Sequence, residues 1–172
     1  MRNNTGKQFE REVAQELDCL AMTDPAFYYF QIPDGLKPLY SKKSHQVVSM
    51  IPVKKTPADF AFSHYGQMGL IEAKTTAQPR LPIGKNGLKP HQLETLTTLW
   101  QEPKRIKTFL LWRYLNTETG GVVLIPGNEL LEIVNHLGTR KSIPWKSFLC
   151  FSCGSILSWS FYKTFTQRLQ KF

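Results

Sequence analysis

Two carboxylates and a lysine fall on two short neighbouring strands, and this arrangement constrains the fold more than any other sequence feature. Apolar residues bounded by turn residues predict strands over 58–63 and 68–74, joined by a tight turn that contains glycine. Asp59 lies at the start of the first strand. Glu72 and Lys74 lie two apart on the second, so their side chains share one face. If the strands pair as a hairpin, the three side chains converge.

Such a cluster needs a physical reason, because it collects charge on an otherwise apolar hairpin. Gathering Asp59, Glu72 and Lys74 away from water costs desolvation free energy unless the charges are matched. A divalent cation matches two carboxylates well, and Mg²⁺ prefers hard oxygen ligands together with water and phosphate. We therefore expect a Mg²⁺ site, with Mn²⁺ as a substitute, that has Asp59 and Glu72 as ligands and Lys74 beside it.

The other predicted elements surround this hairpin with helices and strands. Helices are expected over residues 5–22, 91–101 and 128–136, and further strands over 27–32, 107–115 and 121–125. This order predicts an α/β fold in which a small mixed sheet is flanked by helices. Residues 1–172 fit one domain. Residues 77–90 are expected to be a loop, and 138–172 form a C-terminal extension of unclear role.

A basic segment precedes the two central strands. Residues 33–57 contain prolines, a β-like stretch and several lysines, and they are expected to leave the core as a hairpin or arm. The whole chain has 22 basic and 13 acidic residues, a net charge of +9. Such a charge on a small domain indicates a polyanionic partner, and nucleic acid is the leading candidate.

The central motif resembles that of the PD-(D/E)xK nucleases, with Asp59, Glu72 and Lys74 at the three signature positions. The hairpin placement also resembles the sheet of that superfamily. The resemblance implies a restriction-endonuclease-like core and Mg²⁺-dependent hydrolysis of phosphodiester bonds in DNA. Catalysis would then depend on Asp59, Glu72 and Lys74.

The flanking residues resemble, in order over residues 3–126, the RecU family of Holliday junction resolvases. The matching stretches are Thr5-Gly6-Lys7-Gln8-Phe9-Glu10, Asp59-Phe60, Glu72-Ala73-Lys74-Thr75-Thr76 and His91-Gln92-Leu93. The resemblance implies that Glu10 points to the active site as a further metal ligand and that Gln92 takes part in catalysis. It also implies that segment 33–57 engages a four-way DNA junction. Two nicks across such a junction require two active sites, so a homodimer is expected.

Basic side chains near these motifs are the candidates for DNA contacts. The predicted set is Lys42, Lys43, Lys54, Lys55, Arg80, Lys85, Lys89 and His91. Contacts of this kind with phosphates would give affinity without base recognition. The competing functions are a restriction-type or repair-type endonuclease on duplex DNA, and a basic DNA-binding protein without catalytic activity.

Several other classes of protein are not indicated by the sequence. It has no phosphate-binding glycine loop, so no nucleotide cofactor is expected. It has no apolar run of membrane-spanning length and no secretion signal, so no membrane association is expected. Three cysteines in such a chain favour the reducing cytoplasm. Cys150 and Cys153 have the spacing of a zinc pair, but no second pair accompanies them.

Overall fold

The computed structural model describes residues 5–33, 36–40, 47–52, 56–84, 86–101, 106–116 and 121–147. Its helices are α1 (Thr5–Thr23), α2 (Pro90–Gln101) and α3 (Gly127–Leu137). Its strands are β1 (Phe27–Gln31), β2 (Leu36–Tyr40), β3 (Val47–Pro52), β4 (Phe60–His64), β5 (Gln67–Thr76), β6 (Arg80–Pro82), β7 (Lys107–Tyr114), β8 (Gly121–Pro126) and β9 (Ser142–Pro144). Within these ranges no helix is long and apolar enough to cross a membrane.

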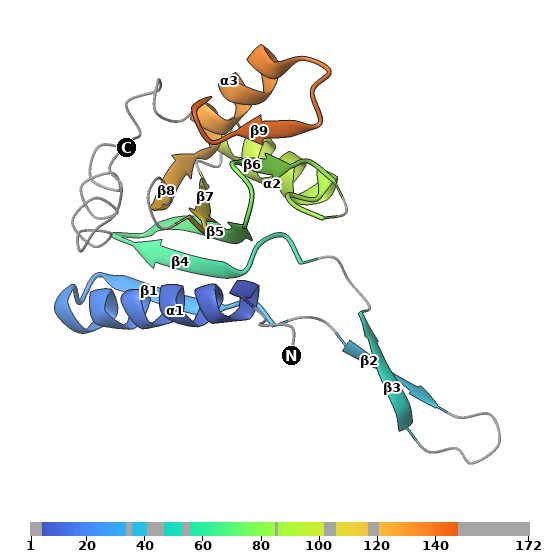
Figure 1. Cartoon of the computed structure of the whole chain (residues 1–172). Coiled ribbons are helices and arrows are strands. Elements are labelled where there is room, and N and C mark those ends of the chain that lie inside the picture. Colours follow the sequence, from blue (N-terminus) through green and yellow to red (C-terminus); the bar gives the residue numbers. More distant parts are fainter. Residues whose placement is uncertain are drawn as a thin grey trace.

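A five-stranded mixed sheet in the order β1-β4-β5-β7-β8 forms the centre of the molecule. Strands β5 and β7 are parallel, and the other neighbouring pairs are antiparallel. Helix α1 runs along one face, whereas α2, α3 and the small β6–β9 pair lie on the other side (Figure 1). The predicted α/β architecture, a small mixed sheet flanked by helices, is confirmed.

Helix α1 seals one face of the sheet with a single apolar stripe. Its buried residues recur at spacings of four, four and three, which puts them on one side of the helix. They join side chains from β1, β4, β5, β7 and β8 in one core. That core consists of Phe9, Val13, Leu17, Leu20, Phe27, Phe60, Phe62, Ile71, Ala73, Phe109, Leu111 and Leu124. Ala73 therefore points away from the face that carries Glu72, as the alternation of the strand predicts.

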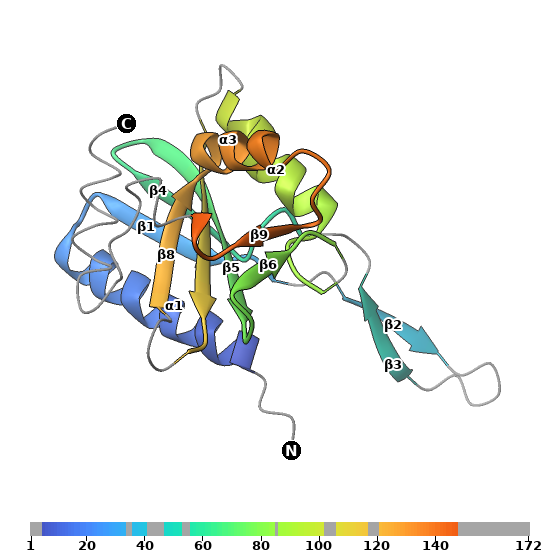
Figure 2. The same ribbon diagram turned by 45° about the horizontal axis from the view of Figure 1, so that its top comes forward.

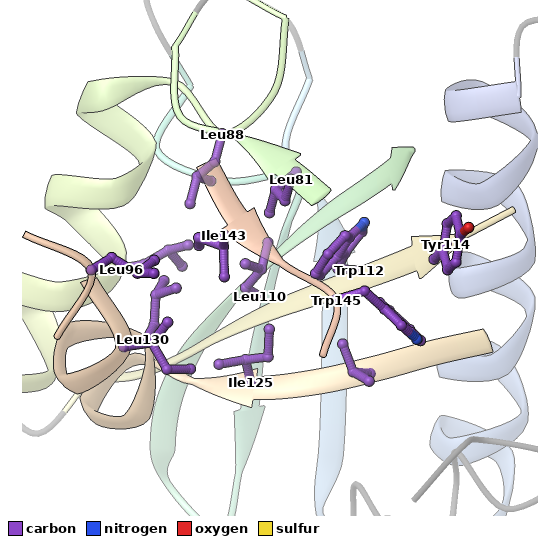
Figure 3. Packing of buried hydrophobic residues seen from close by; sticks show 13 residues of the cluster. Leu81, Leu88, Leu96, Leu110, Trp112, Tyr114, Ile125, Leu130, Ile143 and Trp145 are labelled. Atoms are coloured by element: carbon purple, nitrogen blue, oxygen red, sulfur yellow. The ribbon is translucent and has the colours of Figure 1, made fainter. Parts of the chain in front are cut away.

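A second core fills the space between the opposite face of the sheet and helices α2 and α3 (Figure 3). Its largest member, Trp112 on β7, is fully buried, and the ring of Trp145 meets it edge-on with centroids 4.9 Å apart. The indole N–H of Trp112 donates to Oγ1 of Thr76 at 2.9 Å. This core supports α2, the helix whose first turn approaches Glu72.

Gly127 allows the start of α3 to lie directly against α2 and β7. A Cβ atom at this position would collide with Oγ1 of Thr108 and with the backbone carbonyl oxygen of Leu96. We expect Gly127→Ala to lower the free energy of unfolding by about 1–3 kcal/mol, because the helices must separate to admit the methyl group. Urea denaturation measures this. Glu132→Ala, on the same helix and exposed, is the control, and equal stability of both variants would contradict the close packing.

Strands β2 and β3 form a separate antiparallel hairpin that extends away from the main sheet (Figures 1 and 2). This agrees with the expected arm within residues 33–57. The predicted DNA contacts at Lys42, Lys43, Lys54 and Lys55 lie outside the described residues, as does Lys85.

The prediction that residues 77–90 form a loop throughout is wrong at its centre. Residues Arg80–Pro82 form β6, which pairs antiparallel with β9, about sixty residues later in the chain. Pairing between segments so far apart leaves no trace in a local sequence pattern. The pair places Leu81 and Ile143 in the second core, where both are fully buried.

Candidate active site

The β4–β5 hairpin brings Asp59 next to Glu72. Phe60 pairs with Ile71 in the register of the two strands, so Asp59, one residue earlier, comes opposite Glu72. The backbone N–H of Asp59 donates to the carbonyl oxygen of Ile71 at 3.1 Å. In return, the N–H of Ala73 donates to Oδ2 of Asp59 at 2.8 Å. The first hydrogen bond fixes the backbone at Asp59, and the second holds its carboxylate beside Glu72.

The Glu72 carboxylate is fully buried, and its two oxygens have different surroundings. Oε1 accepts a hydrogen bond from Nζ of Lys74 and another, at 2.6 Å, from Nε2 of Gln92. Oε2 is buried without a hydrogen-bond partner. Because a buried carboxylate oxygen without a partner is costly, Oε2 marks a position where a cation would be stabilised.

Gln92 connects the start of α2 to Glu72. Pro90 occupies the first helical position, where its missing N–H costs nothing. Two residues later, Oε1 of Gln92 accepts a hydrogen bond from the backbone N–H of Lys89 at 3.1 Å. This is the hydrogen bond that the third helical residue makes to the N-cap backbone in a capping box. The amide group of the same side chain donates to Glu72. The Gln92 side chain is buried, so the helix cap and the carboxylate hold each other in position.

The environment of Glu72 strongly favours the neutral carboxyl group. Burial, reinforced by the negative charge of Asp59, raises the pKa of Glu72 to about 8, although Lys74 and Lys89 oppose the shift. Two carboxylates that share a site cannot both ionise cheaply without a compensating positive charge. Lys74 supplies part of that charge, and a divalent cation would supply the rest.

The donor set fits a hard divalent metal. Asp59 and Glu72 present carboxylate oxygens, and the buried Oε2 of Glu72 has no competing donor. Glu10, the third ligand implied by the family resemblance, lies half-buried on α1. In the described part of the chain, no three His, Cys, Asp or Glu side chains come together as a metal-binding group. Asp59 and Glu72 therefore form a two-carboxylate site, which matches the one or two carboxylates that Mg²⁺ typically takes.

The predicted DNA-contacting residues that are described lie near the start of α2 and on β6. Lys89 is exposed directly before α2, and its charge acts on Glu72. His91 is half-buried in the first turn of α2, and Arg80 is exposed at the start of β6. Lys89 is therefore accessible to a ligand and also close enough to lower the pKa of Glu72.

The sequence did not predict that Trp112 lies beside Lys74 in the sheet and is hydrogen-bonded to Thr76. Trp112 pairs with Lys74 in the parallel register of β5 and β7, and its indole is bonded to Thr76 on the strand that carries Lys74. The two partners of this hydrogen bond are 36 residues apart. No local spacing could reveal it, and the tryptophan alone indicates only a core position.

No family model matches the sequence, and no curated protein is similar to it in sequence. Among solved structures, the chain is similar to Hjc, a Holliday junction resolvase from the archaeal hyperthermophile Archaeoglobus fulgidus. The two share 12% sequence identity and a TM-score of 0.50, over 83% of this chain and 89% of that one. At this identity the likeness concerns the fold, and the fold class predicted for this chain, a restriction-endonuclease-like α/β core, is confirmed.

Proposed function

We propose that the protein is a metal-dependent endonuclease that hydrolyses phosphodiester bonds in branched DNA, with four-way junctions as its substrate. The observation that carries the proposal is the side-chain cluster on β5. Glu72 is buried with one oxygen bonded to Lys74 and Gln92 and the other without a hydrogen-bond partner, and Asp59 lies beside it. A buried carboxyl group with a raised pKa, beside a second carboxyl group and a lysine, is typical of a catalytic centre.

Asp59 and Oε2 of Glu72 would hold a Mg²⁺ ion, with Mn²⁺ as a substitute and Glu10 as a further candidate ligand. When bound, the metal would polarise the scissile phosphate and lower the pKa of a coordinated water. Water would attack phosphorus and displace the 3′ oxygen, leaving a 5′-phosphate and a 3′-hydroxyl group.

Lys74 and Gln92 have distinct roles in this proposal. The ammonium group of Lys74 lies at the carboxylate cluster, where it can neutralise charge that develops on the phosphate in the transition state. Gln92 fixes Glu72 through its amide and so orients the oxygen that faces the metal. Gln92 acts through Glu72 and is a positioning residue.

Substrate binding is supported by charge and by the fold. The net charge of +9 favours DNA, and Lys89, His91 and Arg80 are basic residues of the described chain that can contact phosphates. The β2–β3 hairpin extends from the core and lies in the segment that contains Lys42, Lys43, Lys54 and Lys55. The solved structure with a similar fold is itself called a Holliday junction resolvase, which favours a branched substrate over linear duplex.

Cleavage of a labelled four-way junction, compared with a linear duplex of the same sequence, tests this proposal. We expect paired nicks on the junction in Mg²⁺, none in EDTA and little cutting of the duplex. Equal cutting of the duplex would assign the protein to the restriction or repair nucleases. If neither DNA is cut in Mg²⁺ or Mn²⁺, the protein is a DNA-binding protein without catalytic activity.

Gln92→Ala should lower the cleavage rate by about 10–100-fold, because Glu72 loses the donor that orients it. The Mg²⁺ concentration that gives half the maximal rate should rise as well. Thr98→Ala, an exposed change on the same helix, is the control and should leave both values unchanged. If Gln92→Ala lowers thermal stability but leaves the Mg²⁺ dependence unchanged, Gln92 has only its capping role.

A further inference from the structure

The face of the central sheet that carries Glu72 continues onto β4 and β1. Phe60 and Phe62 on β4 belong to the core beneath α1, so Ala61 and Ser63, which alternate with them, point to the opposite face. Helices α2 and α3 pack over β7 and β8 on that face. Because β1 and β4 form the other end of the sheet, their part of the face lies away from these helices (Figure 1).

This end of the face carries a patch of apolar side chains. Tyr28 and Phe30 on β1 are 69% and 60% exposed, and Met68 on β5 is 57% exposed. All of them point to the face that carries Glu72, because each comes opposite a β4 residue that points there. This surface, the aromatic patch, consists of Tyr28, Phe30, Ala61, Ser63, Met68 and Leu70.

The aromatic patch borders directly on the carboxylates. Phe30 comes opposite Ala61, and Asp59 lies two residues before Ala61 in the chain. Such diagonal neighbours on one face of two paired strands are about 7–8 Å apart. The N–H of Ile32 donates to the carbonyl oxygen of Asp59 at 2.8 Å, so β1 stays paired up to this carboxylate. A ligand on the patch would therefore lie beside a phosphate held at Asp59 and Glu72.

The charges divide this region into two parts with different chemistry. Residues 27–33 contain no Asp, Glu, Lys or Arg, and the same is true of the aromatic patch. Lys74 contacts Glu72, and the charge of Lys89 acts on the same carboxyl group. Phosphates bind where cations are, whereas the patch suits a flat group without charge. A nucleotide of DNA offers both groups, since it joins a charged phosphate to an uncharged base.

An unpaired base fits the aromatic patch better than a second protein chain does. A protein packed on Phe30 would lie against Asp59 and would keep a phosphate away from the carboxylates. A base belongs to the same strand as the phosphate, so it can reach Phe30 while the phosphate lies at Asp59. In a duplex the neighbouring bases cover both faces of each base. Only an unpaired or extruded base offers a face that can stack on an aromatic side chain.

From these observations we infer that the aromatic patch binds an unpaired base of the strand that is cut, stacked on Phe30. Tyr28 extends the apolar surface for this base or for the next one along the strand. The inference rests on the proposed function, from which it takes the position of the phosphate. It adds a requirement for the substrate, because the scissile phosphate must then have an unpaired base beside it.

Binding of a short single-stranded oligonucleotide to the full chain in Ca²⁺ tests the inference without any cleavage. The probe carries one 2-aminopurine, a fluorescent base, between two abasic sites, so that no neighbouring base quenches it. The wild type should quench the fluorescence on binding. Phe30→Ala should remove the quenching and raise the Kd of the probe about tenfold. Phe30→Trp should bind like the wild type, whereas Phe30→Leu, which keeps the patch apolar, should bind as weakly as Phe30→Ala.

Two controls separate stacking from other effects on binding. An oligonucleotide with a third abasic site in place of the 2-aminopurine should bind to the wild type and to Phe30→Ala with equal affinity. Met22→Ala changes an apolar residue on α1 that is 81% exposed and lies outside the patch. This variant should bind the probe like the wild type, and every variant should keep the circular dichroism spectrum of the wild type.

Equal affinity and equal quenching in the wild type and in Phe30→Ala would overturn the inference, and would leave the nuclease proposal intact if the wild type cuts junctions. Quenching that depends on Phe30 in a protein that cuts no DNA would support base binding and contradict only the nuclease proposal. Light scattering adds a third outcome. If Phe30→Ala dissociates an oligomer and leaves the Kd of the probe unchanged, the patch binds a protein chain and the inference is wrong.

Discussion

Asp59→Asn should abolish Mg²⁺-dependent cleavage and leave DNA binding intact. Asparagine has the same size and can still accept the hydrogen bond from the N–H of Ala73, so the hairpin should keep its shape. The variant loses the negative charge that the metal needs. Because a bound metal typically contributes several kcal/mol to the stabilisation of the transition state, we expect the rate to fall on the order of 10³-fold.

Initial rates on a labelled four-way junction measure this effect, and a gel-shift titration in Ca²⁺ measures binding. Glu16→Gln removes a carboxylate from the exposed face of α1 and is the matched control. It should cut at the wild-type rate. If the cleavage rate of Asp59→Asn is within about threefold of the wild-type rate, the proposal of metal catalysis at this hairpin is wrong. A parallel loss of binding would mean that the substitution disturbs the fold.

Glu72→Gln should stabilise the metal-free protein at pH 8 while it abolishes cleavage. The pKa of Glu72 is about 8 in the folded protein, against 4.5 for a free side chain, so the folded state holds a proton that the unfolded state releases. The free energy of unfolding therefore falls as the pH rises from about 4.5 to 8. This penalty is on the order of 4 kcal/mol, and glutamine, which does not ionise, avoids it.

Urea unfolding in EDTA at pH 5 and pH 8 measures the difference. The wild type should lose more stability between the two pH values than Glu72→Gln, because all other titrating groups are common to both proteins. Glu94→Gln, an exposed change on α2, should follow the wild type. Identical pH dependence of the wild type and Glu72→Gln would contradict the burial and charge repulsion described for Glu72.

The local parts of the fold and of the site could be predicted from the sequence. The helical spacing of Phe9, Val13, Leu17 and Leu20 identified α1 and its buried face. Strand alternation put Glu72 on the face opposite Ala73, and the structure has this arrangement. These features depend on neighbours within a few residues, where periodicity is informative.

Contacts between distant segments could not be predicted in the same way. The β6–β9 pair joins residues about sixty positions apart, and the Trp112–Thr76 hydrogen bond joins residues 36 apart. A role for Gln92 at the site was expected only through a family resemblance, and its hydrogen bond to Glu72 was not predicted, because that bond depends on where α2 packs against the sheet. Burial of Glu72 also depends on that packing, so its raised pKa has no signal in the local sequence.

Binding of Mn²⁺, followed by electron paramagnetic resonance on the full chain without DNA, tests the two-carboxylate metal centre most directly. The wild type should bind Mn²⁺, and Asp59→Asn and Glu72→Gln should each lose that binding, whereas Glu16→Gln should keep it. Mg²⁺ should compete for the same site. Mn²⁺ binding that is equally strong in the wild type and in both variants would contradict a metal centre formed by Asp59 and Glu72.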